Sequence, residues 1–466
     1  NGSVAAFSST SRAIFVNGSG SINNNNSYGT NATSVTFGGS ISALTANAIL
    51  TFNSADATHH TSLDGLLQDA TGPPSATLSI IQSGTNQLIF NSANTYTGTT
   101  SVNSGQVKVG INAALGTGSV TVSSGAALDL NGKTLANHLS LAGTGVSVSG
   151  ALFNSSTSSA TASGNITLTA DTIIKGSGDL ILSGAIDGAF GLTISNTSYA
   201  IQLGAVGATT ALTSLTLQGT GQNTLGGDIN VNGAVDLKGT SRTTTFTSAD
   251  RIITTTGNSA NGAITIGTVN SAYGLTLNAG SGTITLGLVG NTTPLDTLTL
   301  TGTGTNTLVG GITTTGNIDL GTNRTTAVSA DSTIGSSTGT LNIGAITITA
   351  GKTLTLGLSG VGNITVASIT GPASGTAANV TFSNSGTVSV TGAITTNIGT
   401  LWLNKTSGAV SFAGLLQVSQ FKTDTNAAYN ISLTGASNTI ASFSQATAFA
   451  TSGTLTIGDE IGRAHV

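Results

Sequence analysis

Few side chains in this sequence could carry out acid–base or metal chemistry. Four of them stand close together: Asp56, His59, His60 and Asp64. A metal site needs three or four converging ligands, and the side chains of adjacent histidines in an extended segment diverge. We therefore interpret this segment as polar chain and predict no metal site.

Other patterns that resemble catalytic or nucleotide-binding motifs are incomplete. Gly132-Lys133-Thr134 and Gly351-Lys352-Thr353 resemble the end of a phosphate-binding loop. The Gly required five positions earlier is replaced by Ala127 in the first and Ile346 in the second. His138 has no neighbouring nucleophile motif, and we expect it to be a turn residue or to face solvent. We predict no catalytic, cofactor-binding or metal-binding residues, and a protein that is not an enzyme.

The elements that would have to position such residues are short strands. Charged residues make up only 6% of the 466 residues, so helices with a charged outer face cannot be built in number. Short segments such as Leu215-Thr216-Leu217 instead alternate apolar and polar residues between Gly and Asn. This alternation is typical of strands with one buried face and argues against disorder.

Composition also limits the partners of the chain. The net charge is −4 and there is no basic stripe, so we expect no nucleic-acid partner. No apolar run approaches the roughly 20 residues of a membrane-spanning helix, so we expect no transmembrane helix. Cysteine is absent, which excludes disulfides and thiolate chemistry.

An internal duplication indicates how the strands are arranged. Gly191–Leu237 aligns without gaps to Gly274–Leu320, at an offset of 83 (274 − 191), and more than half of the positions are identical. Such units stack on their neighbours rather than folding alone. With roughly 20 residues per turn, the sequence predicts an all-β fold, a right-handed parallel β-helix (β-solenoid).

Residues 90–135 resemble a known repeat. The matching segments are Asn94-Thr95-Tyr96-Thr97-Gly98, Ala114-Leu115-Gly116 and Gly125-Ala126-Ala127-Leu128-Asp129-Leu130-Asn131-Gly132. They resemble the autotransporter-associated β-strand repeat of autotransporter passengers and large bacterial adhesins. The resemblance implies display at the surface of a Gram-negative-type bacterium through an outer-membrane β-barrel translocator. It implies a stalk or adhesin whose partners are a host, a substratum or sister cells.

We expect the organisation to follow the repeats. The predicted parts are solenoid rungs at 1–54, a loop or short helix at 55–76, solenoid at 77–190, solenoid with the 83-residue tandem repeat at 191–340, and further solenoid at 341–459. The short helix is suggested by Leu63, Leu66 and Leu67, which have helical spacing. We interpret residues 460–466 as a translated sequencing adapter and exclude them from the fold.

Two alternatives remain for the function. Parallel β-helices that cleave polysaccharides use clustered acidic residues with Arg or Lys, which this chain could bring together only through folding. An ice-binding surface is the other alternative, because pairs such as Thr283-Ile284-Thr285 and Thr353-Leu354-Thr355 recur. It requires a flat face of aligned threonines, and the unequal spacing of the strands along the sequence argues against one.

Overall fold

The fold is a β-solenoid of parallel strands stacked in turns of about 22 residues. The computed structural model describes residues 12–23, 34–55, 59–70, 76–256, 262–360, 362–405, 407–424, 429–443 and 453–458. The chain divides into two units, Asn1–Val231 and Asn232–Val466. Almost all the elements are strands, and one short 3-10 turn, η1, spans Val146–Val148. The predicted all-β solenoid is confirmed, whereas the hand of the coil stays a prediction.

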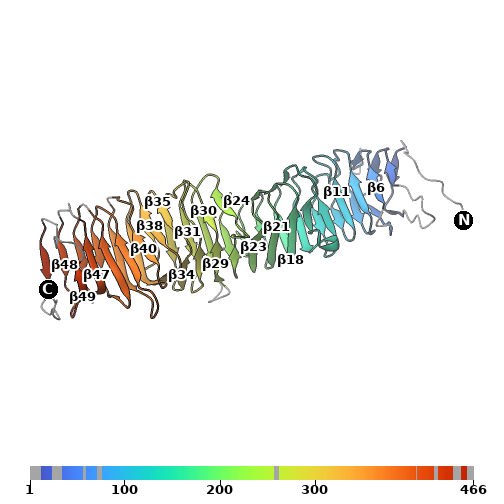
Figure 1. Ribbon diagram of the computed structural model, residues 1–466. Helices are drawn as coiled ribbons and strands as arrows, with labels where there is room; N and C mark the ends of the chain where they lie inside the picture. The colour runs from blue at the N-terminus through green and yellow to red at the C-terminus, as the bar shows by residue number, and fades with distance from the viewer. Residues whose placement is uncertain are drawn as a thin grey trace. The chain divides into compact units, whose positions relative to one another are not determined.

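Unit 1 contains three long ladders of parallel strands and a separate one of only three strands (Figure 1). The first includes β5 (Ala48–Phe52), β8 (Leu78–Gln82), β10 (Thr100–Val102), β12 (Val120–Val122) and β15 (Leu139–Gly143). The second includes β6 (His60–Leu63), β9 (Gln87–Phe90), β11 (Gln106–Val109), β13 (Ala127–Asp129) and β16 (Leu152–Asn154). The third includes β14 (Thr134–Leu135), β17 (Ala160–Ala162), β19 (Leu180–Leu182), β22 (Ile201–Leu203) and β24 (Gln222–Leu225).

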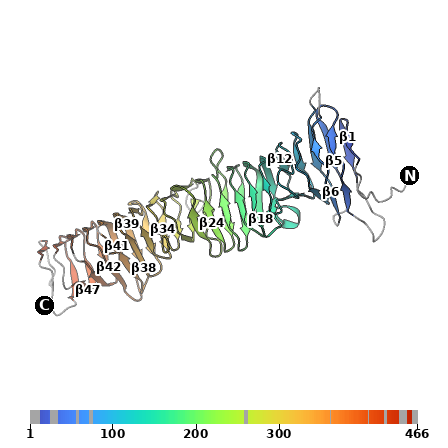
Figure 2. The ribbon, with the colours of Figure 1, turned by 90° about the horizontal axis from the view of Figure 1, so that it is seen from above.

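Unit 2 is built in the same way (Figure 2). One ladder includes β31 (Leu275–Asn278), β33 (Leu298–Thr301), β36 (Ile318–Asp319), β39 (Leu341–Ile348) and β41 (Ile364–Thr370). A second runs through β29 (Ile264–Ile266), β32 (Ile284–Leu286), β34 (Thr305–Leu308) and β37 (Thr325–Val328) to the later halves of β39 and β41. The third starts with β35 (Ile312–Thr314), β38 (Ser332–Ser336), β40 (Thr353–Leu356), β42 (Ala378–Phe382) and β45 (Ile398–Leu403).

The turns differ in length, but the strands of successive turns remain aligned. Leu88 is aligned with Val107, Val107 with Leu128, and Leu128 with Leu152. The successive steps along the sequence are 19 (107 − 88), 21 (128 − 107) and 24 (152 − 128). Because the corners absorb the extra residues, the inward positions still stack directly on one another.

Alternation within the strands builds the core. In β23 (Ser214–Gln218), Leu215 and Leu217 are buried while Thr216 is partly exposed. Each fully buried Leu or Ile stabilises the fold by about 1.5–3 kcal/mol. An isolated turn would expose both faces of its core residues, so the stabilisation depends on the turns above and below.

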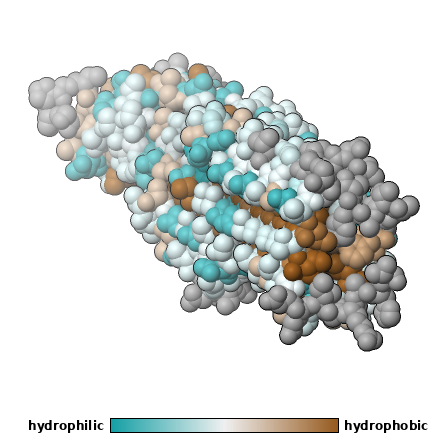
Figure 3. All heavy atoms as spheres, turned by 90° about the vertical axis from the view of Figure 1, so that its left-hand side faces the viewer, coloured by the Kyte–Doolittle hydropathy of each residue, from teal (hydrophilic) through white to brown (hydrophobic). Residues whose placement is uncertain are grey.

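The end of unit 2 that carries its last strands shows what an uncovered turn exposes. Figure 3 views this end, and a hydrophobic patch lies there beside a surface that is mostly hydrophilic. Phe443 of β49 (Thr439–Phe443) and Leu455 and Ile457 of β50 (Leu455–Ile457) are exposed. Equivalent alternating apolar positions in the middle of the stack are buried, because a turn lies on each side of them.

Asn and Asp side chains tie successive turns together at the corners. The Oδ1 atom of Asp179 accepts a hydrogen bond from the backbone N–H of Ala200 at 2.9 Å, and Asn363 Oδ1 accepts one from Thr387 N–H at 3.0 Å. Further acceptors of this kind are Asn165, Asp171, Asp187, Asn270, Asn317, Asp331 and Asn379. Many of the acids therefore satisfy backbone donors of the following turn.

Packing between turns explains several residue types in the segment that resembles the autotransporter-associated repeat. Asn94 is buried and bridges two turns, since its Oδ1 accepts from Leu67 N–H and its Nδ2 donates to the carbonyl of Ala114. The buried Tyr96 ring lies against Gly116, which has φ +58°, and a Cβ there would stand 2.2 Å from the Tyr96 carbonyl oxygen. Only Gly fits this position.

The expectation of a loop or short helix at 55–76 is wrong for the residues described. Residues 60–63 form β6, and Leu67–Gln68 form β7, which pairs with β4 (Ile41–Ala43) in the stack. Leu63 and Leu67 are four residues apart because a turn at Asp64-Gly65 separates two strands, which imitates helical spacing. Asp56 and Pro73-Pro74 lie outside the described residues, as do residues 460–466.

Candidate binding site

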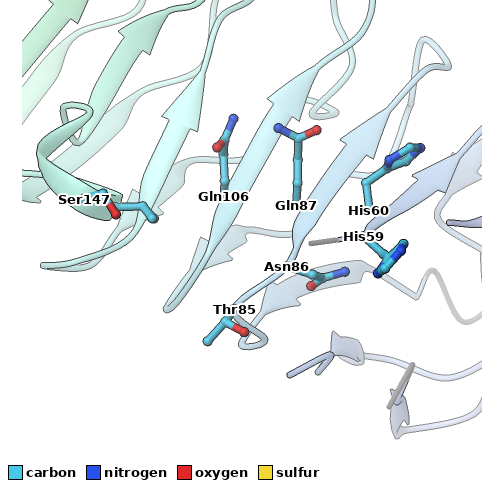
Figure 4. Close-up of a pocket in the computed structure, with 8 residues that line it drawn as sticks. His59, His60, Thr85, Asn86, Gln87, Gln106 and Ser147 are labelled. Carbon is cyan, nitrogen blue, oxygen red and sulfur yellow. The ribbon is translucent and has the colours of Figure 1, made fainter. Parts of the chain in front are cut away.

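A pocket of about 440 Å³ opens on the outer face of the second ladder of unit 1 (Figure 4). Eight residues line it: His59, His60, Thr85, Asn86, Gln87, Gln106, Val146 and Ser147. None of the eight is an acid, a lysine or an arginine, and none has a Phe, Tyr or Trp ring. The pocket is therefore lined mostly by uncharged polar side chains together with two imidazole rings.

The centre of the pocket is a row of three side chains from successive turns. His60 is aligned with Gln87, and Gln87 with Gln106, at the first positions of β6, β9 and β11. Thr61, Leu88 and Val107, the next residues along the strands, are buried, so the row faces outward. Paired strands lie about 4.8 Å apart, and Figure 4 shows the three side chains standing in a line.

One wall of the pocket comes from the loop that contains η1. Ser147 and Val148 have left-handed backbone angles, with φ of +48° and +62°. Such angles are rare for residues other than Gly, and for a β-branched Val they mark genuine strain. The N–H of Gly150 donates to the Thr144 carbonyl at 2.9 Å and closes the base of the loop. The loop is thus held in a strained shape beside Gln106.

The floor of the pocket is rigid. Asn86 is buried, its Nδ2 donates to Thr61 Oγ1 at 3.0 Å, and its Oδ1 accepts from Gln82 Nε2 at 2.9 Å. Gln82 is fully buried and also donates to the carbonyls of Gly84 and Asn86. These bonds fix Asn86, whereas the side-chain amides of Gln87 and Gln106 make no hydrogen bond to any described residue.

His60 is oriented from the turn before it. Its Nδ1 lies 2.8 Å from Ser34 Oγ, and Ser34 directly precedes the strand of the preceding turn, β3 (Val35–Phe37). A serine nucleophile would need a third group on the histidine and an oxyanion-binding pair of donors. Within the described part of the chain no carboxylate is bonded to His60, so the contact fixes the imidazole ring and does not assemble a triad.

Three of the four residues considered as metal ligands are described, His59, His60 and Asp64, and they do not converge. Asp64 lies at the other end of β6, where it accepts hydrogen bonds from Ser62 Oγ at 2.6 Å and Asn91 Nδ2 at 2.8 Å. His59 and His60 both line the pocket, but they extend in different directions (Figure 4). Among the described residues, no group of three His, Asp or Glu side chains could hold a metal ion. His138 is exposed next to a turn, as expected.

Unit 2 buries charged side chains that sequence reasoning missed. Arg324 is 1% exposed. Its Nε donates to Asn306 Oδ1 at 2.6 Å, and its two terminal nitrogens donate to the carbonyls of Gly280, Thr301, Gly282 and Thr305 at 2.8–3.3 Å. Arg242, which is also buried, occupies the corresponding place about one repeat unit earlier. Burial lowers the pKa of Arg324, yet arginine remains protonated.

Lys405 fills a similar position further along. Its Nζ donates to Asn384 Oδ1, to the Asn384 carbonyl and to the Gly386 carbonyl at 2.6–3.1 Å. Burial lowers the pKa of Lys405 to about 8, so the ammonium group is charged at neutral pH and its three donors are used. Arg324 and Lys405 bind oxygen atoms at the corners of the solenoid.

Comparison with protein-family models, with curated proteins and with solved structures finds no match for this chain. The family resemblance of residues 90–135 therefore stays a prediction. No helix in the described ranges is long and apolar enough to span a membrane.

Proposed function

We propose that this chain is the structural and adhesive part of a secreted or surface-displayed bacterial protein that resembles autotransporter passengers. The solenoid fold carries the proposal, because stacked turns present long faces of small polar residues while their ladders fix every outward position. The repeat-like segment at 90–135 adds its resemblance to passenger repeats. In this proposal an outer-membrane β-barrel translocator exports the chain, and host cells, a substratum or sister cells are its partners.

The outer faces fit such a role. Strand residues that face outward, such as Thr216, Thr299 and Ser389, are partly exposed and uncharged. Many of the acids are used as corner acceptors within the fold, as Asp179 and Asp331 are. The polysaccharide-cleaving alternative stays an untested hypothesis.

Surface display tests the proposal. The full chain is fused to an unrelated surface-display carrier in a non-adherent bacterium, and attachment to epithelial cells, to glass and to cells displaying the same chain is counted. We expect attachment to at least one of the three to rise above that of the carrier alone. Attachment equal to the carrier on all three surfaces refutes an adhesive role.

Ice binding is the second candidate, and one feature of unit 2 favours it. Thr265, Thr285 and Thr307 are aligned on consecutive turns, and the same column continues through Ala327 to Thr347, Thr370 and Thr395. All are at least partly exposed. The corners absorb unequal turn lengths, so the objection drawn from uneven spacing does not hold for this column.

Thermal hysteresis tests this candidate. The double variant Thr307→Lys/Thr347→Lys places two charges in the column, whereas Thr276→Lys/Thr365→Lys places them on a neighbouring face of the same unit. An ice-binding column predicts thermal hysteresis that the first pair abolishes and the second retains. Absence of thermal hysteresis in the unaltered chain removes the candidate.

A further inference from the structure

The pocket of unit 1 has the size and the polar lining to hold a small ligand. We infer that the row formed by His60, Gln87 and Gln106 binds a neutral saccharide. The inference rests on the proposed adhesive function and names the chemical class of its ligand. The side chains that line the pocket, their spacing and their hydrogen-bond partners support it.

The lining excludes other classes of ligand. Phosphate and other anionic groups are held by Arg and Lys, which are absent from the lining. Calcium and magnesium sites in proteins usually include carboxylate oxygens, which this lining does not offer, and drug-like apolar ligands fit a mostly hydrophobic lining. Here the only apolar lining residue is Val146. A neutral ligand rich in hydrogen-bonding groups remains.

The side chains offer the complementary hydrogen bonds. A carboxamide presents one acceptor oxygen and a two-proton donor in a plane, so one Gln can accept from one hydroxyl and donate to its neighbour. The side-chain amides of Gln87 and Gln106 make no hydrogen bond to a described residue. The Nε2 atom of His60 also makes no hydrogen bond to a described residue. Vicinal hydroxyl groups of a sugar ring match this set.

The row has a fixed spacing. Neighbouring members are separated by the strand distance of about 4.8 Å, which is comparable with the length of one sugar ring along an extended glycan. Asn86, held by Gln82 and Thr61, gives the floor, and the strained loop at Ser147-Val148 gives a wall at the end of the row. Backbone strain of this kind is concentrated at functional sites.

The test uses the full chain and saccharides of equal length. Binding of cellotetraose, maltotetraose, mannotetraose and chitotetraose is compared with binding of the anionic tetragalacturonate, by saturation-transfer NMR and calorimetry. The double variant Gln87→Ala/Gln106→Ala removes both amides from outward strand positions. Gln202→Ala is the matched control, since Gln202 lies at an outward position of β22 in the same unit.

We expect at least one neutral tetrasaccharide to bind, and tetragalacturonate to bind about ten-fold more weakly or not at all. The double variant loses about ten-fold or more in affinity, and Gln202→Ala stays within about two-fold. No binding of any neutral tetrasaccharide, or equal binding by the double variant, overturns the inference. If the double variant no longer binds saccharides but still adheres, the adhesive function stands without this site. If the unaltered chain binds saccharides but does not adhere, the saccharide site stands and the adhesive function fails.

Discussion

Replacement of Arg324 by Met should destabilise unit 2 locally and strongly. The guanidinium makes five hydrogen bonds, one to Asn306 Oδ1 and four to carbonyl oxygens from two corners, Gly280–Gly282 and Thr301–Thr305. Met fills the space with a similar volume but leaves all five acceptors without this donor. A buried acceptor left without a partner costs about 1–3 kcal/mol, so we expect the loss of these bonds to cost about 3–5 kcal/mol in total.

The loss is measurable by urea unfolding, followed through the single tryptophan, Trp402, which lies in unit 2. With an m value of about 3 kcal/mol/M, the midpoint should fall by roughly 1–1.7 M. Arg324→Lys should fall in between, because Lys keeps the charge but lacks the planar fork. Lys352→Met, at a corner of the same unit, should stay within about 0.5 kcal/mol.

Hydrogen exchange locates the effect. Amides of β32, β34 and β37 should lose protection in Arg324→Met, whereas those of β8 to β12 in unit 1 should not change. A midpoint within error of the unaltered chain, or a loss of protection spread evenly over both units, would refute the assignment of Arg324 as a bond between turns.

Three further predictions concern the corners and the core. Leu215→Asp places a charge at a buried position of β23 and should lower the melting temperature, measured by circular dichroism, whereas Thr216→Asp should change it little. Gly116→Ala should cost more than about 2 kcal/mol because a Cβ would stand 2.2 Å from the Tyr96 carbonyl, and Gly125→Ala, also at positive φ but with nothing within 4 Å, about 1 kcal/mol. From pH 8 to 10 the unfolded chain holds a proton that buried Lys405 has released, so the free energy of unfolding should rise with pH by roughly 2 kcal/mol. In denaturant titrations Lys405→Met should remove that rise, and an unchanged rise would contradict the assignment.

The period-two pattern predicted the strands, and the internal duplication predicted that they stack as a solenoid. Leu215 and Leu217 point inward because strand residues alternate between two faces, and this holds in most of the described strands. The helix expected from Leu63, Leu66 and Leu67 was wrong because the corner at Gly65 separates two short strands. Gly65 is needed there, since a Cβ would stand 1.9 Å from the Gly39 carbonyl oxygen of the preceding turn.

The pocket could not be found from the sequence. Gln106 follows Gln87 at a step of 19 (106 − 87), but Gln87 follows His60 at a step of 27 (87 − 60), so the row follows no constant period. The threonine column of unit 2 was hidden in the same way. Because the corners differ in length, residues that are aligned in neighbouring strands are separated by unequal numbers of residues along the chain.

The sequence contains a weak indication that Arg242 and Arg324 have equivalent positions. Arg242 and Arg324 are related by an offset of 82 (324 − 242), just beyond the ungapped 83-residue duplication, and each precedes two threonines. A one-residue difference in the corner before them breaks the alignment. In a chain with so few charged residues, an Arg is a candidate for a structural role. Its five N–H donors can pair with several backbone carbonyls, which allows the charged side chain to be buried.

Attachment under flow tests the central claim, that the folded solenoid is an adhesive surface, most directly. Beads coated with the full chain are passed over epithelial cells, over glass and over the same chain, beside beads coated with chain that has been irreversibly heat-denatured. The account predicts that the folded chain retains about ten-fold more beads on at least one surface. Equal retention of folded and denatured chain on all three would contradict it.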